Sequence, residues 1–153
     1  MKKIIITLLC LFLLCSCGKI EKIGIEEFQA VMEDYGLKIT DTKDNYRDQN
    51  YYDYIEYSFV ANSENKYVIE FFKATEEENM DILFSTLKEQ AEATYKYGAY
   101  TSGNVDDINS TKFTIKNDDY YVYMRQVEDT LLYVTAKKDY KGDVEDIIDD
   151  LGY

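Results

Sequence analysis

Apolar residues recur along the chain with two different spacings, and the change of spacing divides it into expected helices and strands. Between Gly24 and Gly36 apolar side chains fall three or four residues apart, the period of an amphipathic helix. Gly36 is typical of the glycine that ends a helix in a left-handed conformation. Residues 38–50 are polar and poorly periodic, so we expect mostly a loop there, with a short strand near residues 38–42 as an alternative.

The next two segments predict an antiparallel hairpin. Residues 51–61 alternate between apolar and polar side chains, and residues 66–73 (KYVIEFFK) read as a second strand. Residues 62–65, with the sequence NSEN, have the composition of a turn. We therefore expect two paired strands joined by a four-residue loop.

A long helix is expected after the hairpin. Thr75 with Glu78 three residues later has the signature of a capping box. An apolar stripe with helical spacing continues from Met80 to about Tyr97, and Gly98 ends it. This is the longest helix that the sequence predicts.

The last third of the chain predicts a polar loop, a β-meander and a closing helix. The loop covers residues 100–110, and three short alternating runs follow at residues 111–116, 120–127 and 130–137. After Gly142 and Asp143, four apolar side chains keep helical spacing, namely Val144, Ile147, Ile148 and Leu151.

Together these elements predict an α+β fold with the order αββαβββα. The helices are too few to provide the crossovers of a parallel sheet, so we expect one antiparallel sheet of about five strands, a hairpin plus a meander, with the helices packed on one face. A length of 153 residues with 46% apolar content suits one domain with an ordinary core. We assign residues 24–153 to this domain.

The N-terminal residues have the pattern of an export signal. Lys2 and Lys3 precede an apolar run from Ile4 to Leu14 that only Thr7 interrupts. At about 1.5 Å per helical residue, this run covers roughly half of the hydrocarbon core of a bilayer. It is therefore expected to be the apolar region of a signal peptide and not a spanning helix.

The residues that follow, Leu14-Cys15-Ser16-Cys17, resemble the lipobox of bacterial lipoproteins, with Leu three places before the final Cys and a small residue directly before it. The resemblance implies that residues 1–16 are a signal peptide, that a diacylglycerol is attached to the sulfur of Cys17, and that residues 17–23 are a tether between lipid and domain. The implied address is the outer side of the cell membrane. Cys15 departs from the family pattern, in which Ala, Ser, Thr or Val is commoner. An ordinary secretory signal or an uncleaved anchor is the alternative.

The remainder of the chain is similar in pattern to small uncharacterised lipoproteins of low-GC Gram-positive bacteria. The likeness is carried by residues 125–133 (RQVEDTLLY) and by a closing helix that ends in Leu151-Gly152-Tyr153. It includes no diagnostic motif, so it implies an address and a fold and no activity.

Composition excludes several classes of function. The chain has a net charge of −13, and loss of residues 1–16 would leave 15 basic against 30 acidic residues. A field of that sign repels phosphate backbones, so nucleic-acid binding is not expected. The chain has no histidine, and its three cysteines, Cys10, Cys15 and Cys17, all lie in the N-terminal segment. Histidine-dependent hydrolases, His-ligated zinc and thiol catalysis are therefore excluded for the domain, and no cofactor is expected.

Tyrosines provide the candidate binding surface. The chain has 16 tyrosines and no tryptophan, and exposed tyrosines commonly recognise glycans or protein partners. The candidate residues on the expected strands are Tyr52, Tyr54, Tyr121, Tyr123 and Arg125. The alternative is that the tyrosines reflect β-propensity and cross-strand packing. Arg125 would then bind an anion or pair with Glu56, Glu70 or Glu128.

These features favour a non-enzymatic domain of the cell envelope, anchored to the membrane, that binds a protein or a cell-wall ligand. A small hydrolase acting on cell-wall glycans is the alternative; it would need two carboxylates about 5 to 10 Å apart in a cleft, one with a raised pKa. A structural or inhibitory partner of another protein is a third hypothesis. Two acidic stretches, residues 104–109 and 139–146, contain hard oxygen ligands, but neither has the spacing of a calcium-binding loop, so no metal site is predicted.

Overall fold

A computed structural model describes residues 19–153. The expected signal peptide and Cys17 lie outside the described residues. The helices are α2 (Ile25–Asp34), α3 (Glu77–Tyr95) and α4 (Lys141–Asp150). The strands are β1 (Lys38–Asp41), β2 (Ile55–Ser63), β3 (Tyr67–Ala74), β4 (Thr101–Asp106), β5 (Ser110–Lys116), β6 (Tyr120–Val127) and β7 (Thr130–Lys137). Short 3₁₀ helices cover Lys43–Tyr46 (η1), Tyr52–Tyr54 (η2) and Lys138–Tyr140 (η3).

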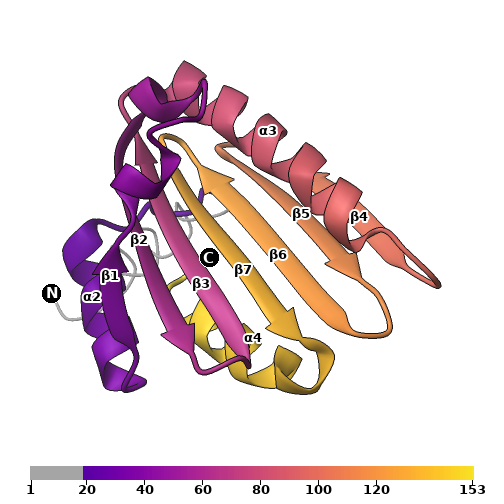
Figure 1. Cartoon of the computed structure of the whole chain (residues 1–153). Helices are drawn as coiled ribbons and strands as arrows, with labels where there is room; N and C mark the ends of the chain where they lie inside the picture. Colours follow the sequence, from indigo (N-terminus) through magenta and orange to yellow (C-terminus); the bar gives the residue numbers. More distant parts are fainter. Residues whose placement is uncertain (1–18) are drawn as a thin grey trace, which may run out of the picture.

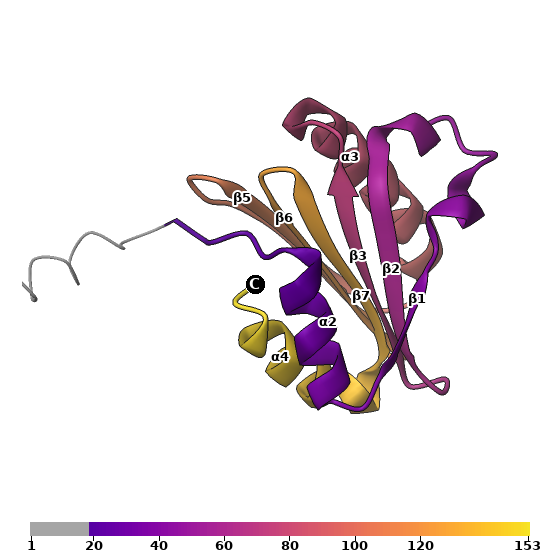
Figure 2. The same cartoon turned by 90° about the vertical axis from the view of Figure 1, so that its left-hand side faces the viewer.

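The seven strands form one antiparallel sheet in the order β1-β2-β3-β7-β6-β5-β4 (Figure 1). Helix α3 lies across one face of the sheet, and α2 and α4 lie on the other (Figure 2). Each face therefore has its own apolar core. None of the helices within residues 19–153 is long and apolar enough to cross a membrane.

The α+β class, the hairpin and the meander are confirmed. β2 pairs with β3 from Ser63 opposite Tyr67 to Ile55 opposite Ala74, and β5, β6 and β7 pair in succession. The hairpin loop has three residues, 64–66, and not four, because β2 continues to Ser63. Glu64 and Asn65 in this loop have positive φ angles of 25° and 69°.

The sheet is wider than the expected five strands, and the element order is αβββαββββα. β4 forms inside residues 100–110, which the sequence predicted as a polar loop, and β1 forms at the start of residues 38–50. All six residues of β4 are exposed, so its sequence shows no alternation. Its strand structure comes from backbone pairing with β5, from Thr101 opposite Lys116 to Asp106 opposite Thr111.

The prediction that all helices pack on one face is wrong. Neighbouring residues of the central strands face opposite cores: Phe71 stacks on Phe28 of α2 with ring centroids 5.0 Å apart, whereas Phe72 belongs to the core beneath α3. Consecutive apolar residues are typical of strands that are buried on both sides. A sheet with two apolar faces needs a helical layer on each face.

Two local expectations also fail. The capping box at Thr75 does not form, because the residue preceding α3 is Glu76, and the Thr75 hydroxyl instead donates a hydrogen bond to the Tyr54 carbonyl oxygen at 3.4 Å. Residues 52–54 form η2 rather than the beginning of β2. Tyr54 therefore packs against the core on the α3 side of the sheet.

Candidate functional site

The structure divides the five candidate residues into two groups. Tyr121, Tyr123 and Arg125 alternate along β6 and lie on the face that α4 covers. Tyr52 and Tyr54 lie on η2, and Tyr54 packs with the core beneath α3. The two groups therefore form no common surface.

The rings of Tyr121 and Tyr123 are also less open than the sequence suggested. They are only 4% and 5% exposed and belong to the core that includes α4. They still border a hollow, because α4 leaves the outer strands of the sheet uncovered on this side.

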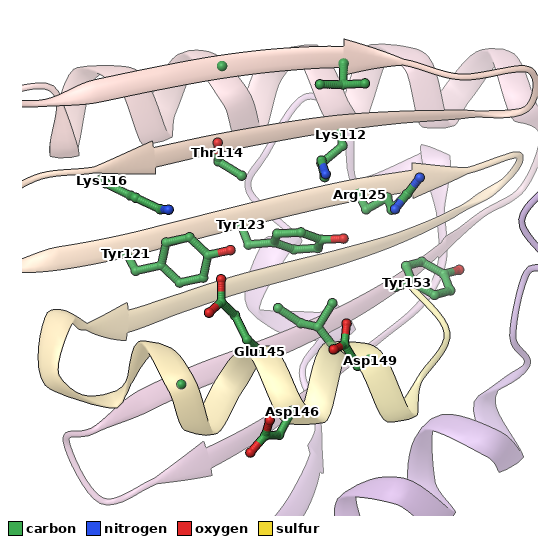
Figure 3. Close-up of a pocket in the computed structure, with 14 residues that line it drawn as sticks. Lys112, Thr114, Lys116, Tyr121, Tyr123, Arg125, Glu145, Asp146, Asp149 and Tyr153 are labelled. Carbon is green, nitrogen blue, oxygen red and sulfur yellow. The ribbon is translucent and has the colours of Figure 1, made fainter.

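This hollow is a trough of about 730 Å³. Strands β4, β5 and β6 form its floor, and α4 with the C-terminal Tyr153 forms its wall (Figure 3). Small residues leave space above the strands, because Gly103 lies opposite Thr114 in the β4–β5 pair. A Cβ atom at Gly103 would meet the Thr114 hydroxyl oxygen at 3.8 Å, in ordinary contact.

Charges of opposite sign line the two sides of the trough. Lys112, Lys116 and Arg125 come from the floor, and Glu145 and Asp149 of α4 point toward it from the wall (Figure 3). Among residues 19–153, no carboxylate oxygen lies within 4.0 Å of the Lys112 or Lys116 ammonium group. Five other lysines of residues 19–153 also have no such partner, so what distinguishes Lys112 and Lys116 is that both line the trough.

Arg125 pairs with none of the three glutamates that the sequence suggested. One guanidinium nitrogen, Nη2, lies 2.8 Å from Asp107 Oδ2 and 3.2 Å from the Ser110 hydroxyl. The Nε–H group is buried and has no hydrogen-bond partner within the described part of the chain. An unsatisfied buried donor of this kind costs about 1 to 3 kcal/mol.

Tyr121 lies between two ammonium groups. The Lys116 and Lys141 nitrogens are 5.6 and 5.3 Å from its ring centroid, and Lys141 also pairs with Glu145. Burial raises the pKa of the Tyr121 hydroxyl, and the nearby Glu145 adds to the rise. Burial also raises the pKa of Tyr123, although Arg125 opposes it. Both hydroxyls therefore remain protonated at neutral pH, where they can donate as well as accept hydrogen bonds.

Glu70 is a half-buried acid that the sequence suggested only as a partner for Arg125. It lies on β3, on the α3 side of the sheet and away from the trough, where the Tyr46 hydroxyl donates a hydrogen bond to it at 3.4 Å. Burial raises its pKa to about 7, and the hydrogen bond from Tyr46 opposes the rise. The signal in the sequence was a single acid inside the apolar run KYVIEFFK.

The side chains of the first acidic stretch have other contacts. Asp107 pairs with Arg125, the Asn104 amide donates to Asp106 at 3.1 Å, and Asn109 binds the backbone of Ile20. Among residues 19–153, no three acidic, cysteine or histidine side chains are grouped so that they could hold a metal ion.

The arrangement of the trough suits binding: two ammonium groups with no carboxylate partner in the described part of the chain, and two hydroxyls, face carboxylates across an open floor. We compared the chain with protein-family models, with curated proteins and with solved structures, and none of them matches it.

Proposed function

We propose that this chain is an extracytoplasmic lipoprotein, held on the cell membrane by lipid on Cys17, and that its domain binds a ligand in the trough without transforming it. The lipobox resemblance at residues 14–17 supports the address. The trough supports the binding role and limits the proposed surface to Tyr121, Tyr123 and Arg125. Tyr52 and Tyr54 are left out because they lie elsewhere on the domain.

The observation that carries the binding proposal is the pair of lysines on the trough floor that have no carboxylate partner within residues 19–153 and face the carboxylates of α4. Lys112 and Lys116 would attract an anionic group of the ligand, and the guanidinium group of Arg125, which also lines the trough, would add positive charge beside them. The carboxylates of Glu145 and Asp149 would accept hydrogen bonds from hydroxyl or amine groups. Cell-wall fragments that combine sugars with short peptides carry both kinds of group, and so do segments of proteins.

The binding proposal is tested by adding solubilised cell-wall fragments to the isotope-labelled protein and following its amide resonances. Binding in the trough should shift the resonances of β5 and β6. The Lys112→Ala/Lys116→Ala double variant should bind at least ten times more weakly. A matched Lys38→Ala/Lys88→Ala variant removes the same charge from β1 and α3, which do not line the trough, and should bind as the wild type does.

Equal affinity of the trough variant and the control would overturn the binding site. The same fragments, recovered after a long incubation, test the non-enzymatic part of the proposal. They should be chemically unchanged, and newly released reducing ends would support the hydrolase instead.

The address is tested separately by growing cells with a labelled fatty acid. The full-length chain should take up the label, and the Cys17→Ala variant should not. A Cys15→Ala variant is the control, because it keeps Cys17 and should still be labelled. Label that persists in the Cys17→Ala variant would contradict the lipoprotein assignment.

A further inference from the structure

The first described residues are fastened to the domain, although the sequence predicted a tether that separates the domain from the lipid. The Asn109 amide donates a hydrogen bond to the Ile20 carbonyl oxygen at 2.8 Å, and the Ile20 N–H donates to Asn109 Oδ1 at 3.1 Å. Ile20 and Ile23 also pack against the core that includes α2 and α4. Residues 19–23 thus have a fixed position beside the ends of β5 and β6 (Figure 2).

Ion pairs reinforce this attachment. Lys19 lies 3.2 Å from Glu128, and Lys22 lies 2.8 Å from Asp129, both in the turn between β6 and β7. Asp129 has a second partner, Lys73, at 2.7 Å. Together with the ion pair between Arg125 and Asp107, these pairs neutralise negative charge at this end of the strongly acidic protein.

The most exposed large apolar side chain among the described residues belongs to the same end. Ile108 is 80% exposed and lies in the turn between β4 and β5, directly before Asn109. The backbone N–H of Glu128 donates to the Asn109 carbonyl oxygen at 3.3 Å, which holds the β4–β5 and β6–β7 turns side by side. A single exposed isoleucine is common on protein surfaces. Ile108 differs in that it lies close to the proposed site of lipid attachment.

Cys17 is close to this turn by chain length alone. It precedes Ile20 by three residues, and an extended chain spans at most about 3.6 Å per residue, so the two Cα atoms are no more than about 11 Å apart. The headgroup layer on each side of a bilayer is about 5 to 8 Å thick. A lipid on Cys17 therefore brings the β4–β5 turn to the membrane surface.

We propose that the domain docks on the bilayer through this end, with Ile108 in the interfacial region, so that the trough opens at the level of the lipid headgroups. The inference rests on the proposed lipidation of Cys17. The end of the trough that contains Arg125 faces the membrane, because Arg125 pairs with Asp107, the residue before Ile108. Lys116 lies at the opposite end of β5, away from the membrane.

The absence of tryptophan from the chain provides a clean probe of this docking. The full-length Ile108→Trp variant is purified from membranes with its lipid and reconstituted into vesicles of phosphatidylcholine and phosphatidylglycerol. Lipids brominated on their acyl chains should quench its fluorescence at least twofold more than they quench a Tyr97→Trp variant. Tyr97 is the matched control, because it is 44% exposed and its hydroxyl lies 3.1 Å from Asp119 in the β5–β6 turn, at the opposite end of the sheet.

Two further measurements make the outcomes distinct. Circular dichroism establishes that both tryptophan variants fold, and mass spectrometry establishes whether Cys17 carries lipid. Equal quenching of the two variants on lipidated protein would overturn the docking and leave the proposed function intact. Protein that carries no lipid would overturn the proposed address, and this inference with it. Adding Asn109→Ala to the Ile108→Trp variant releases Ile20 and should reduce the quenching.

Discussion

Replacing Glu70 by glutamine should stabilise this protein, and more so as the pH rises. The Glu70 side chain lies opposite Tyr133 in the β3–β7 pair and accepts a hydrogen bond from Tyr46. No ammonium or guanidinium group within residues 19–153 lies within 4.0 Å of its carboxylate. Glu70→Gln keeps the size and shape of the side chain and removes the charge that burial penalises.

The magnitude follows from the pKa. Burial raises the pKa of Glu70 from 4.5 to about 7, so the folded protein keeps this proton to a higher pH than the unfolded chain does. Between these two values the unfolded state binds fewer protons, and the free energy of unfolding therefore falls as the pH rises. The full penalty above pH 7 is about 3 kcal/mol, of which roughly 2.5 kcal/mol develops between pH 5 and pH 8.

Urea unfolding, followed by circular dichroism at pH 5 and pH 8, measures this effect. The gain in free energy of unfolding from Glu70→Gln should be about 2.5 kcal/mol larger at pH 8 than at pH 5. Other titrating groups cancel in this difference. Glu89→Gln, at an exposed position on α3, is the control and should show no such change. A gain from Glu70→Gln that is equal at both pH values would refute the reasoning.

Two other substitutions test the core and the charged turn. Phe71 is fully buried and stacked on Phe28, so Phe71→Ala should lower the free energy of unfolding by about 3 to 5 kcal/mol in urea; a loss below about 1 kcal/mol would contradict its central position. Burial raises the pKa of Asp129, but hydrogen bonds from Lys22 and Lys73 outweigh it and leave the pKa below its usual value. Asp129→Asn should therefore cost about 1 kcal/mol at neutral pH and nothing once the pH falls below the folded pKa, as pH-dependent unfolding would show. A cost that persists in acid would indicate a role other than charge.

Part of the candidate site could be read from the sequence. Alternation along β6 places Tyr121, Tyr123 and Arg125 on one face, and the structure brings all three to the trough. The sequence could not show that α4 would bury the two rings, or that Asp107 would be the partner of Arg125. Both depend on where a distant element packs.

The fold shows the same division. The hairpin and the meander were predictable because each strand pairs with its neighbour in sequence across a short turn. β4 was not predictable, because an exposed edge strand needs no apolar alternation and takes its conformation from pairing with β5. The consecutive apolar residues of β3, β6 and β7 are the signal in the sequence that both faces of the sheet are buried.

The sequence by itself determined the type of most elements, the two local strand pairings, the lipobox resemblance and the absence of histidine and thiol chemistry from the domain. Only the tertiary structure decided that β7 lies between β3 and β6, that α3 and α4 cover opposite faces, and that Asn109 holds Ile20 across 89 residues. The physical reason is the range of the interactions. Periodicity, turns and caps act within a few residues and leave a pattern in the sequence. The trough, the half-buried Glu70 and the attached N-terminal segment arise from contacts between distant residues, which no local pattern records.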